Sequence, residues 1–222
     1  AECLAAMQQA VSIPVTVKHR LGIDDLDSKA HFEGFVETVK QSGCQVFIVH
    51  ARKAWLNGLS PKENREVPPL NYGWVYELKA KHPELTIVVN GGVDTLADCE
   101  THLEHLDGVM MGREAYHNPY VLAGVDRQLF DGDHTPSREQ ALQAFIEYSW
   151  QQWRSGTKLH HMSRHILGIF AGQHGGKRFR RYLSENACKK DASPALLQSA
   201  LDEMLHYQAQ HALKLVASKS QV

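Results

Sequence analysis

The sequence lacks paired cysteines, long apolar runs and a net excess of charge of either sign. Its four cysteines, Cys3, Cys44, Cys99 and Cys188, form no Cys-x-x-Cys pair, which excludes a local zinc cluster and a disulfide framework. No apolar run reaches the roughly 18 to 20 residues of a membrane span, so a membrane-spanning protein is excluded. Because the cysteines are unpaired and no targeting segment is recognisable, we expect a cytoplasmic protein that needs no membrane.

Compositional bias is also missing. The 222 residues are 43% apolar and 22% charged, with 16 glycines and 8 prolines, which excludes collagen-like, low-complexity and disordered chains. This length suffices for one or two domains with a buried core. The chain begins with Ala-Glu-Cys and not with Met, so we expect that its start was processed or that residues are missing.

The first 134 residues alternate short β-branched runs with helical periods. The predicted strands are residues 15–20, 46–50, 86–90 and 108–112, separated by predicted helices at residues 29–41, at residues 74–81 and from Thr95 onward. Short connections between strand and helix indicate parallel βα units. Four such units predict an α/β fold that is half of a (β/α)8 TIM barrel. A doubly wound sheet is the alternative, although no Gly-x-Gly-x-x-Gly fingerprint supports it.

Glycines and an arginine follow the last two predicted strands. Asn90-Gly91-Gly92 ends the third strand and Gly112-Arg113 ends the fourth. Glycines allow a backbone to approach an anion, and an arginine can bind phosphate oxygens with two N–H groups. In (β/α) barrels the loops after the last two strands form the customary phosphate site. The spacing therefore predicts a phosphate site, although either dipeptide alone is typical of a turn.

Two further polar residues occur on or after the predicted strands. Lys18 lies within a strand, where it either meets an anion or a ligand's oxygens or extends its amino group into solvent. His50 ends the next strand and, with Arg52, offers a hydrogen-bonding ring beside a cation; a structural histidine is the alternative. His161 and His165 have metal-ligand spacing on a helix but no third ligand nearby, so we expect no metal site.

From residue 135 onward the pattern predicts helices only. The expected helices are residues 137–154, 159–170, 177–187 and 194–216, which predicts a separate all-α domain over residues 135–222. Between residues 158 and 190 eight lysines and arginines face a single acidic residue, so this segment carries +7 and the rest of the chain −8. Such density favours RNA phosphates as partners. A solvated helix face is the alternative.

The chain resembles the tRNA-dihydrouridine synthases, and in particular the A-type enzymes of bacteria. The motifs are Val15-Thr-Val-Lys-His-Arg20, Val49-His-Ala-Arg52, Leu59-Ser-Pro-Lys-Glu-Asn-Arg65-Glu-Val-Pro-Pro-Leu70, Val89-Asn-Gly-Gly92 and Val109-Met-Met-Gly-Arg113. They occur in the family's order, and the likeness continues through Lys177-Arg-Phe-Arg-Arg-Tyr-Leu183. The resemblance thus covers nearly the whole chain.

The resemblance implies a flavoprotein oxidoreductase that acts in tRNA processing. In this family NADPH reduces FMN, the flavin N5 delivers hydride to uracil C6, and an acidic cysteine protonates C5. The substrate it implies is uridine at positions 20 and 20a of the tRNA D-loop. The target base has to leave its stack to reach the flavin, as base-modifying enzymes generally require.

The resemblance also assigns expected roles to residues of this chain. It places Lys18 near the N1–C2=O edge of the flavin and His50 in contact with the flavin. The expected phosphate-holding residues are Asn90, Gly91, Gly92, Gly112 and Arg113. The expected tRNA-binding residues are Lys62, Arg65, Arg178 and Arg181. No metal is expected, and a monomer is favoured.

The chain departs from the family in one respect. The family's first four strands are absent, and with them the Asn-x-Gly-Cys-Pro loop that carries the proton-donating cysteine. We therefore expect residues 1–134 to be strands 5 to 8 of the FMN-binding barrel, with no catalytic residue in this chain and no activity by itself. The alternatives are an RNA-binding module on an inactive half-barrel and another FMN-dependent pyrimidine reductase.

Overall fold

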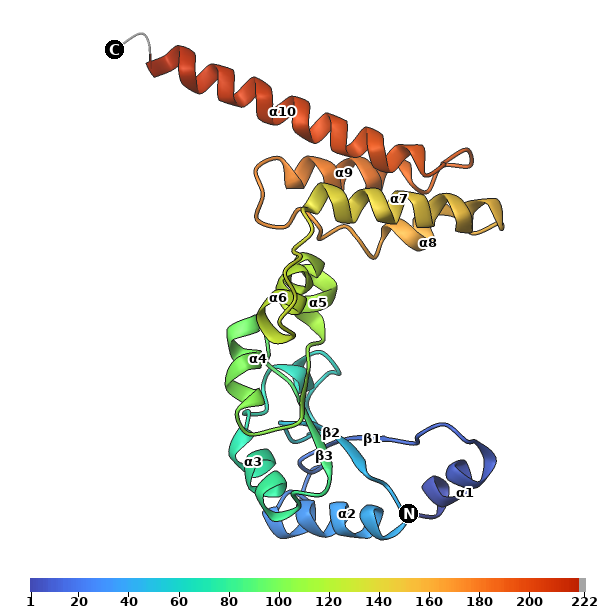
Figure 1. Ribbon diagram of the computed structural model, residues 1–222, viewed down its shortest axis with the longest axis vertical. Helices are drawn as coiled ribbons and strands as arrows, with labels where there is room; N and C mark the ends of the chain where they lie inside the picture. The colour runs from blue at the N-terminus through green and yellow to red at the C-terminus, as the bar shows by residue number, and fades with distance from the viewer. Residues whose placement is uncertain (220–222) are drawn as a thin grey trace. The chain divides into compact units, whose positions relative to one another are not determined.

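The computed structural model describes residues 1–219, and side chains as far as residue 213 (Figure 1). The chain divides into two compact units, Ala1–Gly112 and Arg113–Val222. The expected boundary between the flavin-binding half-barrel and the tRNA-binding helical domain, at residues 134 and 135, stays a prediction. No helix within residues 1–219 is both long and apolar enough to cross a membrane.

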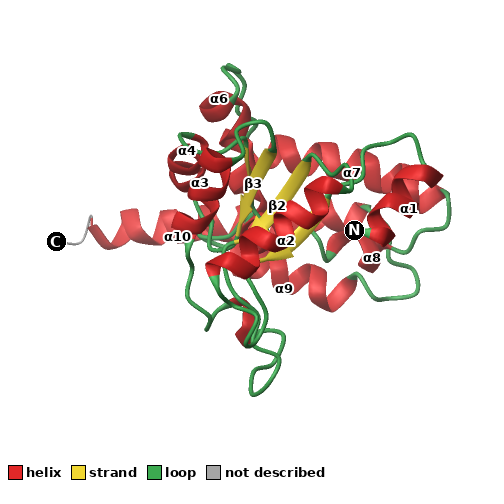
Figure 2. Cartoon of the chain, turned by 90° about the horizontal axis from the view of Figure 1, so that it is seen from below, coloured by secondary structure: helices red, strands yellow, loops and turns green. Residues whose placement is uncertain are grey.

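The first unit contains a four-stranded parallel sheet in the order β1-β2-β3-β4. The strands are β1 (Val17–Arg20), β2 (Val46–His50), β3 (Thr86–Asn90) and β4 (Gly108–Met110). Figure 2 shows β2 and β3 side by side, with helices beside them. The predicted α/β class with parallel strands is confirmed, and β2 and β3 have the predicted bounds.

Helices lie before and between these strands, and α2 and α3 pack on one face of the sheet. They are α1 (Glu2–Ala10), α2 (Lys29–Gln41), α3 (Tyr72–Lys81), α4 (Leu96–Leu103) and the short 3-10 helix η1 (Glu63–Arg65). The packing follows strand alternation. Phe47, Val49, Ile87 and Val89 are fully buried against apolar residues of α2 and α3, while the residues between them are partly exposed. This alternation places His50 and Asn90, which are polar and partly exposed, on the opposite face of the sheet.

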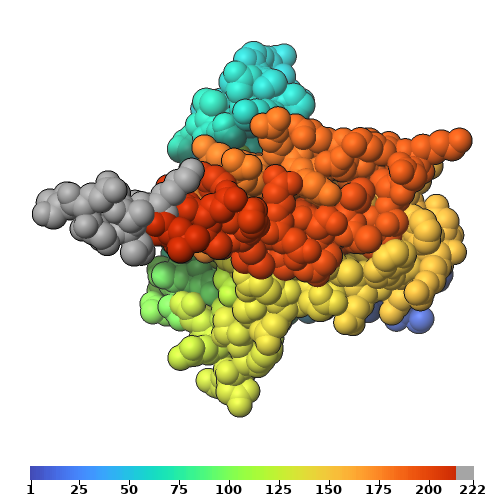
Figure 3. All heavy atoms as spheres, turned by 90° about the horizontal axis from the view of Figure 1, so that it is seen from above, coloured from blue at the N-terminus to red at the C-terminus, as the bar shows by residue number. Residues whose placement is uncertain are grey.

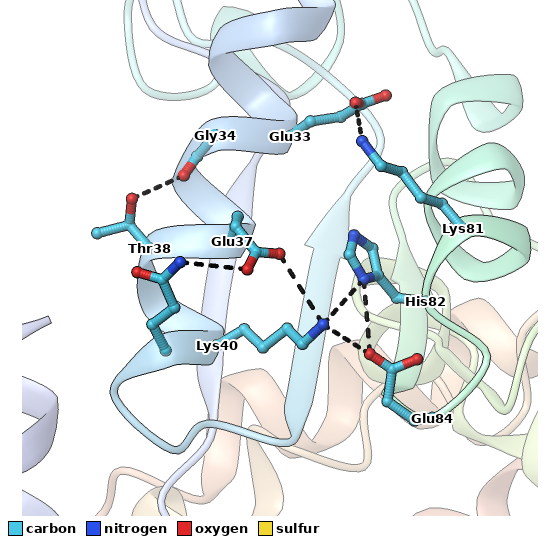
Figure 4. Close-up of polar contacts among 9 residues, drawn as sticks. Glu33, Gly34, Glu37, Thr38, Lys40, Lys81, His82 and Glu84 are labelled. Carbon is cyan, nitrogen blue, oxygen red and sulfur yellow. Dashed lines mark hydrogen bonds and ion pairs between the residues drawn. The ribbon is translucent and has the colours of Figure 1, made fainter.

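Polar contacts join the end of α2 to the segment that links α3 with β3 (Figure 4). The Lys40 Nζ lies 2.8 Å from the Glu84 Oε1 and donates to the His82 Nδ1 at 3.3 Å. Higher on the same helix, Glu33 accepts a hydrogen bond from Lys81 at 2.6 Å. His82 is buried, the Glu33 side chain is 25% exposed and that of Glu84 is 50% exposed, so the network covers the edge of the apolar interface between α2 and α3.

The described residues of the second unit, 113–219, form helices joined by loops and turns. Its elements are α5 (Arg113–His117), η2 (Pro119–Gly124), α6 (Val125–Leu129), α7 (Arg138–Arg154), α8 (Leu159–Ser163), α9 (Gly176–Asn186) and α10 (Ala195–Lys219). Its core gathers Leu142 from α7, Phe179 from α9 and Leu197 from α10. Figure 3 shows the orange surface of α9 beside the red surface of α10, and the two helices are in contact.

The expected helix at residues 159–170 is wrong beyond Ser163. The chain continues in successive tight turns, in which each of His165, Ile166 and Ile169 donates its N–H to the carbonyl three residues back. Gly168 packs directly on the backbone of His117, where an added Cβ would lie 1.8 Å from the His117 carbonyl oxygen. The apolar spacing in this segment reflects burial of Ile166 and Ile169 and not an α-helix.

Candidate functional site

Parallel pairing brings the carboxyl ends of the strands into one row. Arg20 is paired with His50, His50 with Asn90 and Asn90 with Met110. Residues in register on parallel strands point to the same side, and this side is opposite to the buried Val49 and Val89. The predicted site residues His50 and Asn90 therefore lie together on the face of the sheet that the helices leave open.

Lys18 reaches this row from β1, where it lies two residues before Arg20 and therefore on the same face of the sheet. Its Nζ donates to the Asn90 Oδ1 at 2.8 Å, and the Asn90 Nδ2 donates to the Met110 carbonyl at 2.8 Å. The bonds fix the rotamer of Asn90 and carry the ammonium across β2 to β3. Burial, followed by the charge of Arg20, lowers the pKa of Lys18. A partly desolvated ammonium held against a neutral amide is suited to binding an anion.

The backbone after β3 comes close to its neighbours because it lacks side chains. Gly91 and Gly92 have φ of +106° and +68°. A Cβ on Gly91 would lie 2.4 Å from the His50 Cδ2, and one on Gly92 would lie 2.5 Å from the Leu70 Cδ1. The Tyr72 hydroxyl donates to the Gly91 carbonyl at 2.7 Å. The Gly-Gly turn is thus held in place with the His50 ring packed against it.

Arg20 and Asn64 hold the loop between β2 and α3, and the sequence did not predict this role. The Arg20 Nη1 donates to the carbonyls of Lys53 and Asn64, both at 2.8 Å. Asn64 is buried, accepts from the Trp55 N–H at 2.8 Å and donates to the Trp55 carbonyl at 2.5 Å. The Ser-Pro-Lys-Glu-Asn-Arg motif contains Asn64, but nothing in the sequence indicates which of its residues points inward.

The same loop brings further cations to the strand ends. Burial, and then the charges of Arg52 and Arg65, lower the pKa of Arg20. Arg65 ends η1, its Nε donates to the Pro61 carbonyl at 2.9 Å, and it is exposed. Lys62 precedes η1 and is also exposed. The structure therefore groups Arg65 with Arg20 and Arg52, and such a group of like charges favours an anionic ligand.

Gly112 and Arg113 lie where the two compact units meet in the chain. Gly112 follows β4, and a Cβ placed on it would meet only the Asn90 Nδ2, at 3.9 Å. Arg113 is the first residue of α5. Gly112 therefore leaves the space beside Asn90 open, as a backbone that approaches a phosphate requires.

The predicted residues Arg178 and Arg181 lie on α9, in the second unit. They line a groove of about 440 Å³ with Lys177, Tyr182, Glu185 and Glu203. The Arg181 Nε donates to the Glu185 Oε1 at 2.7 Å, and the Arg178 guanidinium lies 4.1 Å from the centre of the Tyr207 ring. Each guanidinium has five N–H donors, so both keep donors for a phosphate while these contacts orient them.

The three cysteines of the first unit lie away from the carboxyl ends of the strands, and Cys3 is exposed in α1, which precedes β1. Cys44 is buried before β2, at the amino end of the sheet, and Cys99 is buried in α4. Burial, followed by the charge of Asp98, raises the pKa of the Cys99 thiol. Among the described residues no group of three His, Cys, Asp or Glu side chains could hold a metal ion.

These features define an α/β protein whose parallel strands end in a row of polar residues, with cations and a closely packed Gly-Gly turn beside them. The pattern of the family described as Dihydrouridine synthase (Dus) matches residues 1–205. The chain is 55% identical over 203 residues to the tRNA-dihydrouridine(20/20a) synthase of Yersinia pestis, covering 90% of this chain and 59% of the relative. The protein of that name from Vibrio cholerae serotype O1 is 52% identical over 204 residues, covering 90% of this chain and 62% of the relative.

The same name belongs to a relative from Escherichia coli (strain K12). It is 50% identical over 221 residues, which cover 99% of this chain and 61% of the relative. The chain therefore belongs to the dihydrouridine synthase family, which confirms the resemblance seen in the motifs. It spans about three fifths of the length of the curated relatives it matches.

Proposed function

We propose that this chain supplies the FMN-binding strand ends and the tRNA-binding helices of a tRNA-dihydrouridine synthase. The reaction is reduction of the 5,6 double bond of uridine at D-loop positions 20 and 20a, with NADPH as the source of electrons, in the cytoplasm. The relatives are named as synthases of dihydrouridine 20 and 20a in tRNA. The observation that carries the proposal is the Lys18–Asn90 hydrogen bond beside the Gly91-Gly92 turn.

The residues at the strand ends fit an FMN phosphate and an anionic flavin edge. Glycines with no Cβ after β3 and β4 leave backbone room for the phosphate, which Asn90, Gly91, Gly92, Gly112 and Arg113 would hold. When bound, FMN supplies the hydride for the reduction. Lys18 would place its ammonium at the flavin N1–C2=O edge, and His50, seated on Gly91, would contact the flavin.

The sheet and the helices take separate roles in this proposal. The four strands are strands 5 to 8 of a (β/α)8 barrel, which places the reactive groups at their carboxyl ends. The domain boundary lies near residue 134, and the helices that follow bind tRNA. Lys62 and Arg65 from the first unit, and Arg178 and Arg181 from α9, would contact its phosphates.

Flavin binding tests the proposed site. The chain is titrated with FMN and with riboflavin, which lacks the phosphate, while flavin fluorescence is recorded. We expect tighter binding of FMN, and we expect Arg113→Ala to remove most of the preference while leaving riboflavin binding unchanged. Equal affinity of the unaltered chain for the two flavins would contradict the proposal that the strand ends bind the FMN phosphate.

Activity of the chain by itself tests the assignment of the proton donor. Within the described residues of the first unit no cysteine lies at the strand ends, where a proton donor is needed. We therefore expect no dihydrouridine when unmodified tRNA is incubated with the chain, FMN and NADPH. Dihydrouridine formation at position 20 under these conditions would overturn this part of the proposal.

A second candidate function is an RNA-binding module whose sheet has no flavin chemistry. The basic groove on α9 favours it, because the groove can bind phosphates whether or not a flavin is present. The two candidates differ in one measurement. A chain that binds tRNA but neither FMN nor riboflavin supports the RNA-binding module.

A further inference from the structure

The second unit contains another basic groove, at the end of the helical bundle where two loops meet. The loop between α7 and α8 and the loop between α9 and α10 lie side by side there (Figure 1). The groove has a volume of about 290 Å³, and we call it the Trp153 groove. Its main lining residues are Trp153, Lys158, His160, Cys188, Lys189 and Lys190. None of these residues takes part in the function proposed above.

Trp153 forms a fixed aromatic surface in this groove. Its Nε1 donates to the Ala192 carbonyl at 3.2 Å, and its ring meets the Trp150 ring edge-on, with centroids 5.5 Å apart at 85°. The residue is nevertheless 40% exposed. Two contacts therefore hold the indole in one orientation while part of it faces solvent, which lowers the entropy cost of stacking a planar ligand on it.

Positive charge surrounds the indole. Lys158, Lys189 and Lys190 are exposed, and no acidic residue lines the groove. Lys189 is oriented by a hydrogen bond to the Asn186 Oδ1 at 2.6 Å, while Lys158 and Lys190 form no ion pair within the described part of the chain. Partial burial and the positive charges nearby lower the pKa of His160. Two lysines are thus available to an anion.

Backbone geometry keeps the entrance of the groove open. Gly156 has a φ of +95°, and a Cβ placed on it would meet nothing within 4 Å. Beneath the groove, Leu159 and Ala187 are buried in the core of the unit. The floor of the groove is therefore apolar, while its rim is cationic.

We propose that the Trp153 groove binds one unpaired nucleotide of an RNA, with its base on the Trp153 ring and its flanking phosphates on Lys158 and Lys190. Aromatic rings beside cations are what single-stranded nucleic acids bind, since every base has a π face and every linkage an anionic phosphate. The inference rests on the proposed function only for the source of the RNA, which is the tRNA substrate. An acidic peptide is the other class of ligand that the charge fits, and competition between polyglutamate and oligouridylate separates the two.

Cysteine alkylation gives a local readout of this binding. Cys188 is exposed in the groove and Cys3 is exposed in α1, whereas Cys44 and Cys99 are buried. The intact chain is treated with iodoacetamide in the presence of unmodified tRNA or a short oligouridylate. We expect both RNAs to slow the alkylation of Cys188 several-fold while the alkylation of Cys3 proceeds at its original rate.

Substitutions test the two halves of the proposed contact. Trp153→Leu is expected to weaken oligouridylate binding by about tenfold, because base stacking on an aromatic ring contributes ~1–3 kcal/mol. Trp153→Phe keeps an aromatic face and should retain most of the affinity. Lys158→Ala and Lys190→Ala should each reduce the salt dependence by about 0.7 in slope. Arg127→Ala removes one exposed charge from α6 and is the matched control, for which we expect no change.

The outcomes separate this inference from the proposed function. If Arg178→Ala/Arg181→Ala weakens tRNA binding while Trp153→Leu and Trp153→Phe both bind RNA as the unaltered chain does, the inference fails and the proposed function stands. If tRNA does not bind the chain at all, the proposed function fails at its substrate. Equal protection of Cys188 by polyglutamate and by oligouridylate would overturn the nucleotide assignment in favour of an acidic protein partner.

Discussion

At the scale of single residues, the candidate site depends on glycines, which have no side chain. Gly91 lets the His50 ring lie where a Cβ would stand, at 2.4 Å, and it has a φ of +106°. Two separate costs therefore oppose any larger residue at this position. One is the left-handed backbone and the other is the collision with the imidazole.

A glycine without such neighbours allows the two costs to be separated. Gly58 has a φ of +84° but nothing within 4 Å of its ideal Cβ. We expect Gly58→Ala to lower the free energy of unfolding by ~1–2 kcal/mol through the backbone alone. Gly91→Ala should cost a further ~1–3 kcal/mol, because the His50 ring is displaced. Urea unfolding measures both, and equal losses would show that the ring moves aside without strain.

The ion pair between Lys40 and Glu84 makes a prediction about acid stability (Figure 4). The hydrogen bond from Lys40 lowers the pKa of Glu84 to about 2, from an ordinary value of 4.5. Since the folded-state pKa lies below the unfolded one, the stabilisation is present above pH 4.5 and is lost as the pH falls toward 2. We therefore expect Lys40→Met to destabilise the chain at neutral pH, with a deficit that shrinks over this range.

The partner of Lys40 provides the control for that experiment. In a Glu84→Gln background the carboxylate is gone, so adding Lys40→Met should produce a deficit that does not vary between pH 4.5 and 2. Both residues are partly exposed, so the effect should also diminish in high salt. A pH dependence that persists in the Glu84→Gln background would assign the effect to another carboxylate, such as Glu37.

At the scale of elements, the best-predicted helices are those with capping signals in the sequence. Ser28 caps α2 at the predicted start, and Ser137 and Gln140 form a capping box on α7. Residues 159–170 had only apolar spacing as a guide, and this spacing cannot distinguish a helix from a series of buried turns. The close contact between Gly168 and His117 that favours the turns joins residues far apart in sequence.

The same distinction between local signals and long-range contacts applies to the candidate site. Gly91, Gly92 and Asn90 were predictable because they end a strand directly. The roles of Arg20 and Asn64 were not, because they depend on how the loop before α3 folds back onto β1. The local sequence indicates where helices and strands end. The contacts of Arg20 and Asn64 join residues far apart in the sequence, so they form only in the folded chain.

The capping box of α7 supports a prediction about stability. The Ser137 Oγ accepts from the Gln140 N–H at 3.1 Å, and the Gln140 Oε1 accepts from the Ser137 N–H at 2.7 Å. Ser137→Ala is expected to cost ~1 kcal/mol of unfolding free energy, whereas Ser137→Gly should cost only a few tenths. Ser184→Ala, in the middle of α9, is the control and should be nearly neutral. If Ser137→Ala costs no more than Ser184→Ala, the cap contributes nothing to stability.

At the scale of the whole molecule, positive and negative charge are concentrated in different parts of the chain. The net charge is −1, yet residues 158–190 carry +7 and the rest of the chain −8. The basic segment contributes α9, whose Phe179 and Leu183 are buried while Lys177, Arg178, Arg180 and Arg181 are exposed. The helix therefore uses its apolar face for the core and its cationic face for solvent. An anionic polymer would meet positive potential on this helix and negative potential over much of the remaining surface.

Salt dependence of tRNA binding tests this division. Each phosphate neutralised by a lysine or arginine contributes about 0.9 to the slope of the logarithm of affinity against the logarithm of salt concentration. We therefore expect Arg178→Ala/Arg181→Ala to weaken binding of unmodified tRNA and to reduce the slope by about two. Lys29→Ala/Lys81→Ala removes the same charge from ion pairs of α2 and α3, and it should leave the slope unchanged. If both double variants reduce the slope equally, tRNA responds to the net charge of the chain and not to the groove on α9.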